Sequence, residues 1–282
     1  MSLSNILDNL SRFRQDAESE RYGHHDYEHR FGMAIDLDIC IGCNACSTAC
    51  YAENNLPVVG KDYFEQGQAM HWMRIERYWD DEELEHPERG ASFIPMMCQQ
   101  CGAATCEPVC PVAATYHTPD GLNAQVYNRC IGSRYCSNNC PFRVRYFNFW
   151  SFYESSWPEP LNQQLNPDLS VRDKGVMEKC TFCIQRIRVA KDSAAREERN
   201  MIDGDVITAC AQACPTNAIV FGDTMDPTSQ VSLAWKKHEV KRGPYTHKEA
   251  KSDEEIRGYR VFDELNVDPS VMYLERVRDS EV

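Results

Sequence analysis

The stretch CIGCNACSTAC, residues 40–50, places four cysteines in the order C-x2-C-x2-C-x3-C, and CIGSRYCSNNC, residues 130–140, repeats it without a gap. The two segments share the first cysteine, the Ile-Gly pair, the third cysteine, the serine after it and the last cysteine. They differ at one decisive position, because Cys43 in the first segment corresponds to Ser133 in the second. An internal repeat of this kind predicts two copies of one loop, of which the second lacks a thiol.

The remaining cysteines form two further runs. Residues 98–110 read C-x2-C-x4-C-x3-C, and residues 180–214 contain a C-x2-C pair, 26 intervening residues and a C-x3-C pair. Proline follows the last cysteine of three runs, at Pro111, Pro141 and Pro215. In chain order the runs hold four, four, three and four cysteines, which accounts for all fifteen.

These spacings are typical of iron-sulfur ligation, since the run at residues 40–50 has the spacing of bacterial ferredoxins. Structural zinc, which uses two separated CxxC pairs, is the alternative, but three cysteines in one loop favour a cubane. Disulfides are disfavoured, because fifteen is an odd number and the first thirty residues lack the pattern of a signal peptide. The preceding FGMAIDLDI alternates apolar residues, which predicts a short strand leading into the loop.

The ligand sets depend on which runs are partners, because in two-cluster ferredoxins the fourth cysteine of each run binds the cluster of the other run. Cys110 and Cys130 are only twenty positions apart, so the second and third runs form an inner module and the first and fourth an outer one. Three [4Fe-4S] clusters are then predicted: set 1 is Cys40, Cys43, Cys46 and Cys214; set 2 is Cys50, Cys180, Cys183 and Cys210; set 3 is Cys98, Cys101, Cys106 and Cys140.

The fourth set is incomplete. Set 4 contains Cys110, Cys130 and Cys136, with Ser133 at the vacant corner. A serine hydroxyl is a poor iron ligand where thiolates are available, so the sequence predicts a [3Fe-4S] centre. A serine-ligated cubane is the alternative, and electron paramagnetic resonance (EPR) separates the two, because an oxidised three-iron centre is paramagnetic.

Composition excludes several functions. The 282 residues include 43 acidic and 30 basic side chains, a formal charge of −13, which argues against nucleic acid as a partner. No apolar run approaches the roughly 18 residues of a membrane-spanning helix, and phosphate-loop and hydrolase motifs are missing. Because protein ligands hold every iron, the pattern favours an electron relay over a catalytic site.

The predicted fold class is α+β, with two interleaved two-cluster ferredoxin modules and an extension at each end. The outer module covers residues 32–89 and 158–224, and the inner module covers residues 90–157. Residues 1–31 are predicted to be a docking extension, in which an amphipathic helix over residues 2–20 presents Leu3, Ile6, Leu7, Leu10 and Phe13.

Three other segments carry expectations. Residues 225–282 are expected to form a polar arm, a surface excursion up to about residue 258, and then a turn and a closing strand at Val271–Leu274. The aromatic stretch at residues 142–157 has two readings, a core strand or a surface that meets another subunit. Negative thiolate clusters need basic neighbours, and the candidates are Arg134, Arg143, Arg145 and Lys179.

Several strings, among them IDLDICIGCNAC, VYNRCIGSRYCSNNCP and KCTFCIQRI, resemble the four-cluster ferredoxin subunits of the complex iron-sulfur molybdoenzyme superfamily. They look most like the iron-sulfur component of alternative complex III and of the menaquinone reductase complex of sulfate reducers. The resemblance implies three [4Fe-4S] clusters and one [3Fe-4S] cluster, the latter beside the quinone site of a polysulfide-reductase-type integral membrane subunit.

The resemblance also implies partners and a location. The expected partners are a large molybdopterin-fold subunit and a multihaem cytochrome c, on the periplasmic face of the membrane, with the export signal carried by a partner. The chain alone suggests the cytoplasm. Two other functions stay open: the relay subunit of a true molybdoenzyme, such as a polysulfide, tetrathionate or dimethyl sulfoxide reductase, and a soluble polyferredoxin shuttle.

Overall fold

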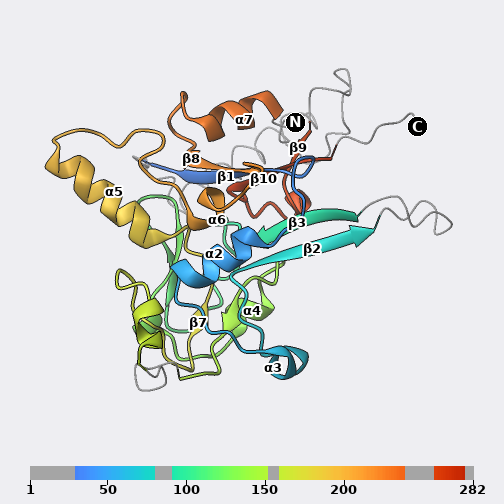
Figure 1. Ribbon diagram of the computed structural model, residues 1–282, viewed down its shortest axis with the longest axis vertical. Helices are drawn as coiled ribbons and strands as arrows, with labels where there is room; N and C mark the ends of the chain where they lie inside the picture. Colours follow the sequence, from blue (N-terminus) through green and yellow to red (C-terminus); the bar gives the residue numbers. More distant parts are fainter. Residues whose placement is uncertain (1–28, 80–90, 152–158, 239–256, 277–282) are drawn as a thin grey trace, which may run out of the picture.

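Strand β1, Phe31–Asp36, lies at the centre of a four-stranded sheet with the order β8-β1-β10-β9 (Figure 1). It pairs antiparallel with β8, Ile219–Asp223, and parallel with β10, Val271–Leu274, which in turn pairs with β9, Gly258–Tyr259. The computed structural model describes residues 29–79, 91–151, 159–238 and 257–276. The sheet therefore joins the two ends of the described chain and fixes the first cysteine run beside the fourth.

Alternate residues of this sheet face two different cores, as the period of a strand requires. Met33 and Ile35 enter the main core, whereas Ala34 belongs to a smaller cluster beneath helix α7, Gln230–His238. The strands predicted before Cys40 and at Val271–Leu274 are both confirmed.

Helix α7 differs from the expected surface excursion. Its residues Val231, Ala234 and Trp235 recur at helical spacing and pack on the outer face of the sheet. The lysine-rich end of the helix, Lys236–Lys237, concealed this apolar face in the sequence pattern. Residues 239–256, the predicted helix at residues 2–20 and part of the aromatic stretch, residues 152–158, lie outside the described residues.

Three two-stranded sheets link the cysteine runs. Strands β2, Met73–Trp79, and β3, Ala91–Met97, form a long ribbon between the first and second runs. The inner module contains β4, Thr115–His117, paired with β5, Asn123–Gln125. Strand β6, Tyr146–Phe147, pairs with β7, Met177–Glu178, and so connects the third run with the fourth.

Short helices follow the cysteine loops. They are α2, Ala45–Glu53; α4, Tyr135–Asn138; α5, Ile184–Arg196; and α6, Ala209–Gln212. Further turns are α3, Lys61–Glu65, and the 3-10 helices at Tyr127–Arg129, Leu161–Gln164 and Asp263–Leu265. The mixture of helices and strands confirms the α+β class.

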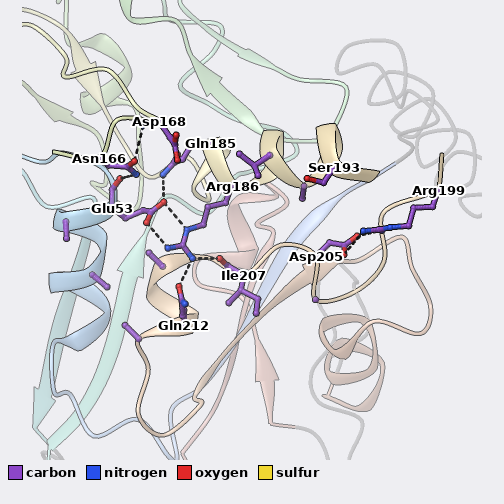
Figure 2. Close-up of a pocket in the computed structure, with 17 residues that line it drawn as sticks. Glu53, Asn166, Asp168, Gln185, Arg186, Ser193, Arg199, Asp205, Ile207 and Gln212 are labelled. Carbon is purple, nitrogen blue, oxygen red and sulfur yellow. Dashed lines mark hydrogen bonds and ion pairs between the residues drawn. The ribbon is translucent and has the colours of Figure 1, made fainter. Parts of the chain in front are cut away.

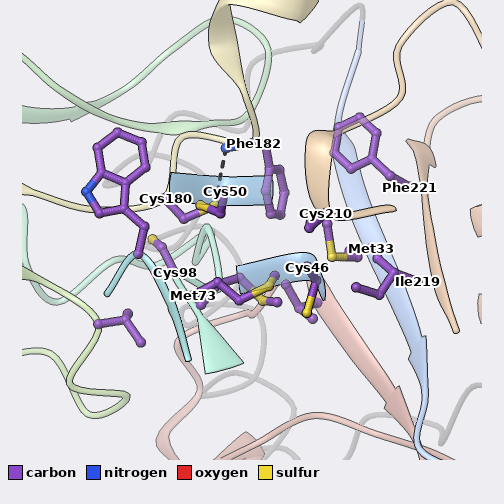
Figure 3. Packing of buried hydrophobic residues seen from close by; sticks show 14 of the residues in the cluster. Met33, Cys46, Cys50, Met73, Cys98, Cys180, Phe182, Cys210, Ile219 and Phe221 are labelled. Atoms are coloured by element: carbon purple, nitrogen blue, oxygen red, sulfur yellow. Dashed lines mark hydrogen bonds between the residues drawn. The ribbon is translucent and has the colours of Figure 1, made fainter. Parts of the chain in front are cut away.

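The main core contains cysteines as well as ordinary apolar side chains. Cys46, Cys50, Cys98, Cys180 and Cys210 are buried with Met33, Met73 and Phe182 around them (Figure 3). No helix within the described ranges is long and apolar enough to cross a membrane.

Candidate metal centre: four groups of thiols

The first and third cysteine runs adopt the same loop conformation. Gly42 and Gly132 have φ angles of 66° and 72°, and the helix-capping residues Asn44 and Arg134 have φ angles of 61° and 64°. Two features disfavour a side chain at Gly132. Its φ angle is positive, and an added Cβ would lie 2.5 Å from the carbonyl oxygen of Gly175. The repeat in the sequence therefore encodes a repeat in the backbone.

The second and fourth runs are also alike. Gln100 and Phe182, which precede the second cysteine of each CxxC pair, both have positive φ angles, as do Ala113 and Asn217. The N–H of Ala114 donates to the Sγ of Cys110 at 3.2 Å, and that of Ala218 donates to the Sγ of Cys214 at 3.3 Å.

These bonds favour thiolates. Burial acts to raise the pKa of Cys110, but hydrogen bonds from backbone N–H groups outweigh it and the pKa is lowered. The pKa of Cys214 is lowered in the same way, with the Thr216 hydroxyl contributing. These donors were not among the predicted site residues, although two of the three Cys-Pro cysteines, Cys110 and Cys214, are followed four residues later by alanine.

The members of set 1 surround one cavity of about 20 Å³, which Cys40, Cys43, Cys46 and Cys214 line together with Ile75 and Ile219. The members of set 3 surround a second cavity of about 20 Å³, which Cys98, Cys101, Cys106 and Cys140 line together with Phe142 and Arg145. In each case the structure brings together four thiols that come from two different runs.

All four members of set 2 are buried. The pKa of Cys50 is raised well above its usual range, first by burial and then by repulsion from the thiols of Cys180, Cys183 and Cys210. The last cysteine of the first run thus lies among cysteines of the fourth run.

Set 4 is less tightly defined. Cys130 and Cys136 pack in one apolar cluster with Cys106 and Met177, and the N–H of Met177 donates to the Sγ of Cys130 at 3.4 Å. Cys110 lies outside this cluster, but its neighbour Val109 packs against it. Ser133 is exposed, as is its counterpart Cys43.

Contacts across the set boundaries give the order of the four groups. Sets 1 and 2 share helix α2, which carries Cys46 and Cys50. The side-chain amide of Gln100, in the loop of set 3, donates to the carbonyl of Cys180 of set 2 at 2.8 Å. Cys106 of set 3 packs in one cluster with Cys130 and Cys136 of set 4. The thiols therefore follow one another as sets 1, 2, 3 and 4. Within the described residues, no three His, Cys, Asp or Glu side chains are grouped so as to hold a single metal ion.

Comparison with known proteins agrees with this pattern of thiols. Residues 39–114 match the model of the 4Fe-4S dicluster domain. The chain is 40% identical over 255 residues to the iron-sulfur cluster-binding subunit of menaquinone reductase from Nitratidesulfovibrio vulgaris, covering 89% of this chain and 91% of the relative. The chain belongs to the iron-sulfur subunits of the complex iron-sulfur molybdoenzyme superfamily.

Other members of this family are more distant. A putative dimethyl sulfoxide reductase iron-sulfur subunit from Halobacterium salinarum is 32% identical over 86% of this chain and 78% of its own length. The Hdr-like menaquinol oxidoreductase iron-sulfur subunit 1 from Archaeoglobus fulgidus is 33% identical over 72% of this chain and 74% of its own length. The chain is thus an iron-sulfur electron-transfer subunit of the kind found in quinone oxidoreductase and molybdoenzyme complexes.

A groove of about 900 Å³ lies beside set 2 and is lined by residues of helices α2, α5 and α6 (Figure 2). Within it the guanidinium of Arg186 makes a bidentate ion pair with Glu53, at 2.9 and 2.7 Å. The pKa of Glu53 is lowered mainly by this hydrogen bond. Since Glu53 ends the helix of the first run and Arg186 follows Cys183, the pair fastens the first run to the fourth.

The basic residues expected near the thiols divide into two groups. Arg145 and Lys179 are buried, and the charges of both act on Cys106. Arg134 and Arg143 are exposed, contrary to expectation, and Arg134 lies over the ring of Phe147. In the described part of the aromatic stretch, Phe142 is buried and Phe149 is exposed, so this stretch serves partly as core and partly as surface.

Proposed function

We propose that this chain relays electrons between a periplasmic cytochrome c side and the quinone site of a membrane-bound menaquinone oxidoreductase. It does so with three [4Fe-4S] clusters, held by sets 1, 2 and 3, and one [3Fe-4S] cluster, held by Cys110, Cys130 and Cys136. The observation that carries the proposal is the ordered succession of the four thiol sets.

The donor chemistry suits iron-sulfur clusters. Buried thiols need a positive partner to ionise, and cationic iron supplies it. Backbone N–H groups directed at Cys110, Cys130 and Cys214 provide the hydrogen bonds that such ligands receive in other iron-sulfur proteins. When bound, the clusters supply one-electron transfer, and the chain's own residues fix their positions and exclude water.

The two modules are proposed to interleave. Pairing of β1 with β8 and the Glu53–Arg186 ion pair support the partnership of the first and fourth runs. For the second and third runs, the hydroxyl of Thr105 donates to the carbonyl of Asn139 at 2.8 Å, and the Asn139 amide donates back at 2.6 Å. The inner module is therefore enclosed in sequence between the two halves of the outer one.

The proposed partners are a molybdopterin-fold large subunit, a polysulfide-reductase-type membrane subunit that binds quinone, and a multihaem cytochrome c. The relative with 40% identity is a menaquinone reductase subunit, which favours this assignment over a true molybdoenzyme. The family resemblance implies that the three-iron centre lies nearest the quinone, and the position of set 4 at one end of the succession of thiols is consistent with this.

The test is purification of the native complex, with identification of its subunits, iron and molybdenum analysis, and an assay of menaquinone reduction by reduced cytochrome c. We expect about fifteen non-haem irons per copy of this chain, no molybdenum and quinone reduction. Molybdenum at one atom per complex would instead identify a true molybdoenzyme, and a stable isolated monomer without partners would identify a soluble shuttle.

A further inference from the structure

Arg145 is a buried cation between two groups of thiols. Only 3% of its surface is exposed. Its Nη1 donates to the Sγ of Cys106 in set 3 at 3.2 Å and to the Oδ1 of Asn123 at 3.2 Å. Its Nη2 donates to the hydroxyl of Thr115 at 2.7 Å and to the side-chain oxygen of Gln125. Cys106 itself packs in one cluster with Cys130 and Cys136 of set 4, so the guanidinium lies close to both sets.

The oxygens that hold Arg145 are all neutral, and its buried Nε has no hydrogen-bond partner among the described residues. A buried guanidinium without a carboxylate is costly. A second buried arginine, Arg172, has its charge neutralised by a carboxylate, because it forms an ion pair with the buried Glu178 at 3.0 Å. The negative charge that compensates Arg145 must therefore come from thiolates and the groups they hold.

Arginine keeps its proton at any ordinary pH, so the charge beside Cys106 stays fixed whatever the oxidation state of the neighbouring centres. A second buried cation, Lys179, also acts on Cys106.

The outer module has a different residue at the matching position. Alignment of Cys140 with Cys50 places Arg145 opposite Asn55, a neutral amide. The neighbouring Asn54 donates a long, 3.6 Å hydrogen bond to the Sγ of Cys50. Near Cys183 the charge of Glu53 opposes that of Arg186. Among the described residues, a cation that donates directly to a ligand sulfur is therefore found in the inner module alone.

We infer that Arg145 sets the order of the reduction potentials, by raising those of the centres held by sets 3 and 4 above the values they would have beside a neutral residue. Reduction adds one electron and one negative charge to such a centre, and no proton moves. A fixed cation at hydrogen-bond distance from a ligand stabilises that added charge strongly, because the surroundings are buried. This inference rests on the proposed function, in that it takes the ligand sets as given.

The experiment is an EPR-monitored redox titration of the purified complex with three variants of this chain. Arg145→Gln removes the charge and keeps part of the hydrogen bonding, whereas Arg145→Lys keeps the charge. Arg143→Gln is the matched control, since Arg143 lies two residues away and is exposed to solvent that screens its charge. Iron and sulfide content is measured for each preparation.

In Arg145→Gln we expect the equilibrium constant for reduction of the set 3 cubane, whose ligand Cys106 accepts the hydrogen bond, to fall at least tenfold, which is about 59 mV in midpoint potential. The three-iron centre should shift in the same direction, and Arg145→Lys and Arg143→Gln should change either constant less than threefold. Fully loaded Arg145→Gln with unchanged midpoints would overturn the inference. If Arg145→Gln does not bind its full complement of iron, the test is made with Arg145→Lys. A tenfold fall in the equilibrium constant for reduction in Arg145→Lys, which keeps the charge, would also overturn the inference.

The two proposals fail in distinguishable ways. Absence of the three-iron signal in the parent complex would count against the assignment of set 4. The reduced set 3 cubane would still report whether the charge of Arg145 raises its potential.

Discussion

The loops at residues 40–50 and 130–140 share a backbone and differ in what they offer to a metal. Gly42 and Gly132 have matching positive φ angles, and both loops lead into a helix through a left-handed residue. Yet the second position carries a thiol in Cys43 and a hydroxyl in Ser133, both exposed. Loop shape is thus set by glycine placement and cysteine spacing, while the kind of centre is set by one donor atom.

The largest effect is expected from Ser133→Cys, which removes the one difference in donor atom between the two loops. Restoring the missing thiol should convert the three-iron centre into a cubane, because the loop already has the conformation that positions Cys43. We expect the EPR signal of the oxidised protein to disappear and the iron content to rise by about one atom per chain.

Ser133→Ala is the matched control for that substitution. It removes the hydroxyl without adding a donor, so the oxidised signal should be unchanged if serine binds no iron. A changed spectrum in Ser133→Ala would show instead that the serine is a ligand and that the centre is a serine-ligated cubane.

The mirror substitution, Cys43→Ser, should make set 1 resemble set 4. Because Cys43 is exposed, its loss leaves the core packing intact. We expect a second oxidised three-iron signal and the loss of about one iron, measured by EPR spin quantification and metal analysis. Retention of all iron with an unaltered spectrum would remove Cys43 from the ligand set.

Alanine substitutions at Gly42 and Gly132 test how strongly each loop depends on its glycine. A positive φ costs alanine about 1 kcal/mol at either position. At Gly42 the added Cβ meets the ring of Phe93, a side chain that can shift, whereas at Gly132 it meets the backbone carbonyl of Gly175 at 2.5 Å.

Gly132→Ala should therefore destabilise the protein more than Gly42→Ala, by roughly 1–2 kcal/mol, as expected for overpacking. The measurement is thermal unfolding of both loaded variants under identical conditions. Equal losses of stability would mean that the backbone at Gly175 moves as easily as the Phe93 ring.

Sequence reasoning succeeded where one periodic feature decided the structure. The strand before Cys40 follows from alternation, and the strand at Val271–Leu274 follows from an apolar run after a turn. The cysteine spacing, taken with the ligand exchange of two-cluster ferredoxins, predicted that Cys214 would lie with Cys40, and both line one cavity.

Features that depend on contacts between residues far apart in the chain could not be predicted from the sequence. Arg143 and Arg145 cannot be told apart from the sequence, since both are arginines in the same aromatic stretch. In the structure Arg143 is exposed, whereas Arg145 is buried and donates hydrogen bonds to Asn123, Thr115 and Gln125. Likewise, the lysines of α7 suggested a surface segment, while the sheet formed by β1, β8 and β10 provided an apolar face for the helix to cover. Neither partner surface exists until the chain has folded.

The smallest expected effect concerns the residue after the first run, where Tyr51 replaces the proline of the other three. The Tyr51 hydroxyl lies 2.6 Å from the Nδ1 of His71. Burial, and then the charge of Arg74, lower the pKa of His71 below its usual value of 6.5. As the pH drops through about 6.5, His71 takes up a proton in the unfolded chain but stays neutral in the folded one. The free energy of unfolding therefore falls below that pH, and this histidine does not affect it above that pH.

Unfolding in denaturant between pH 8 and about 5.5 should accordingly show a weaker pH dependence in His71→Gln than in the parent. Tyr51→Phe should keep the parent's dependence, because burial of the imidazole, rather than the tyrosine hydroxyl, is the main cause of the lowered pKa. Identical slopes in His71→Gln and the parent would show that another group is responsible for the pH dependence.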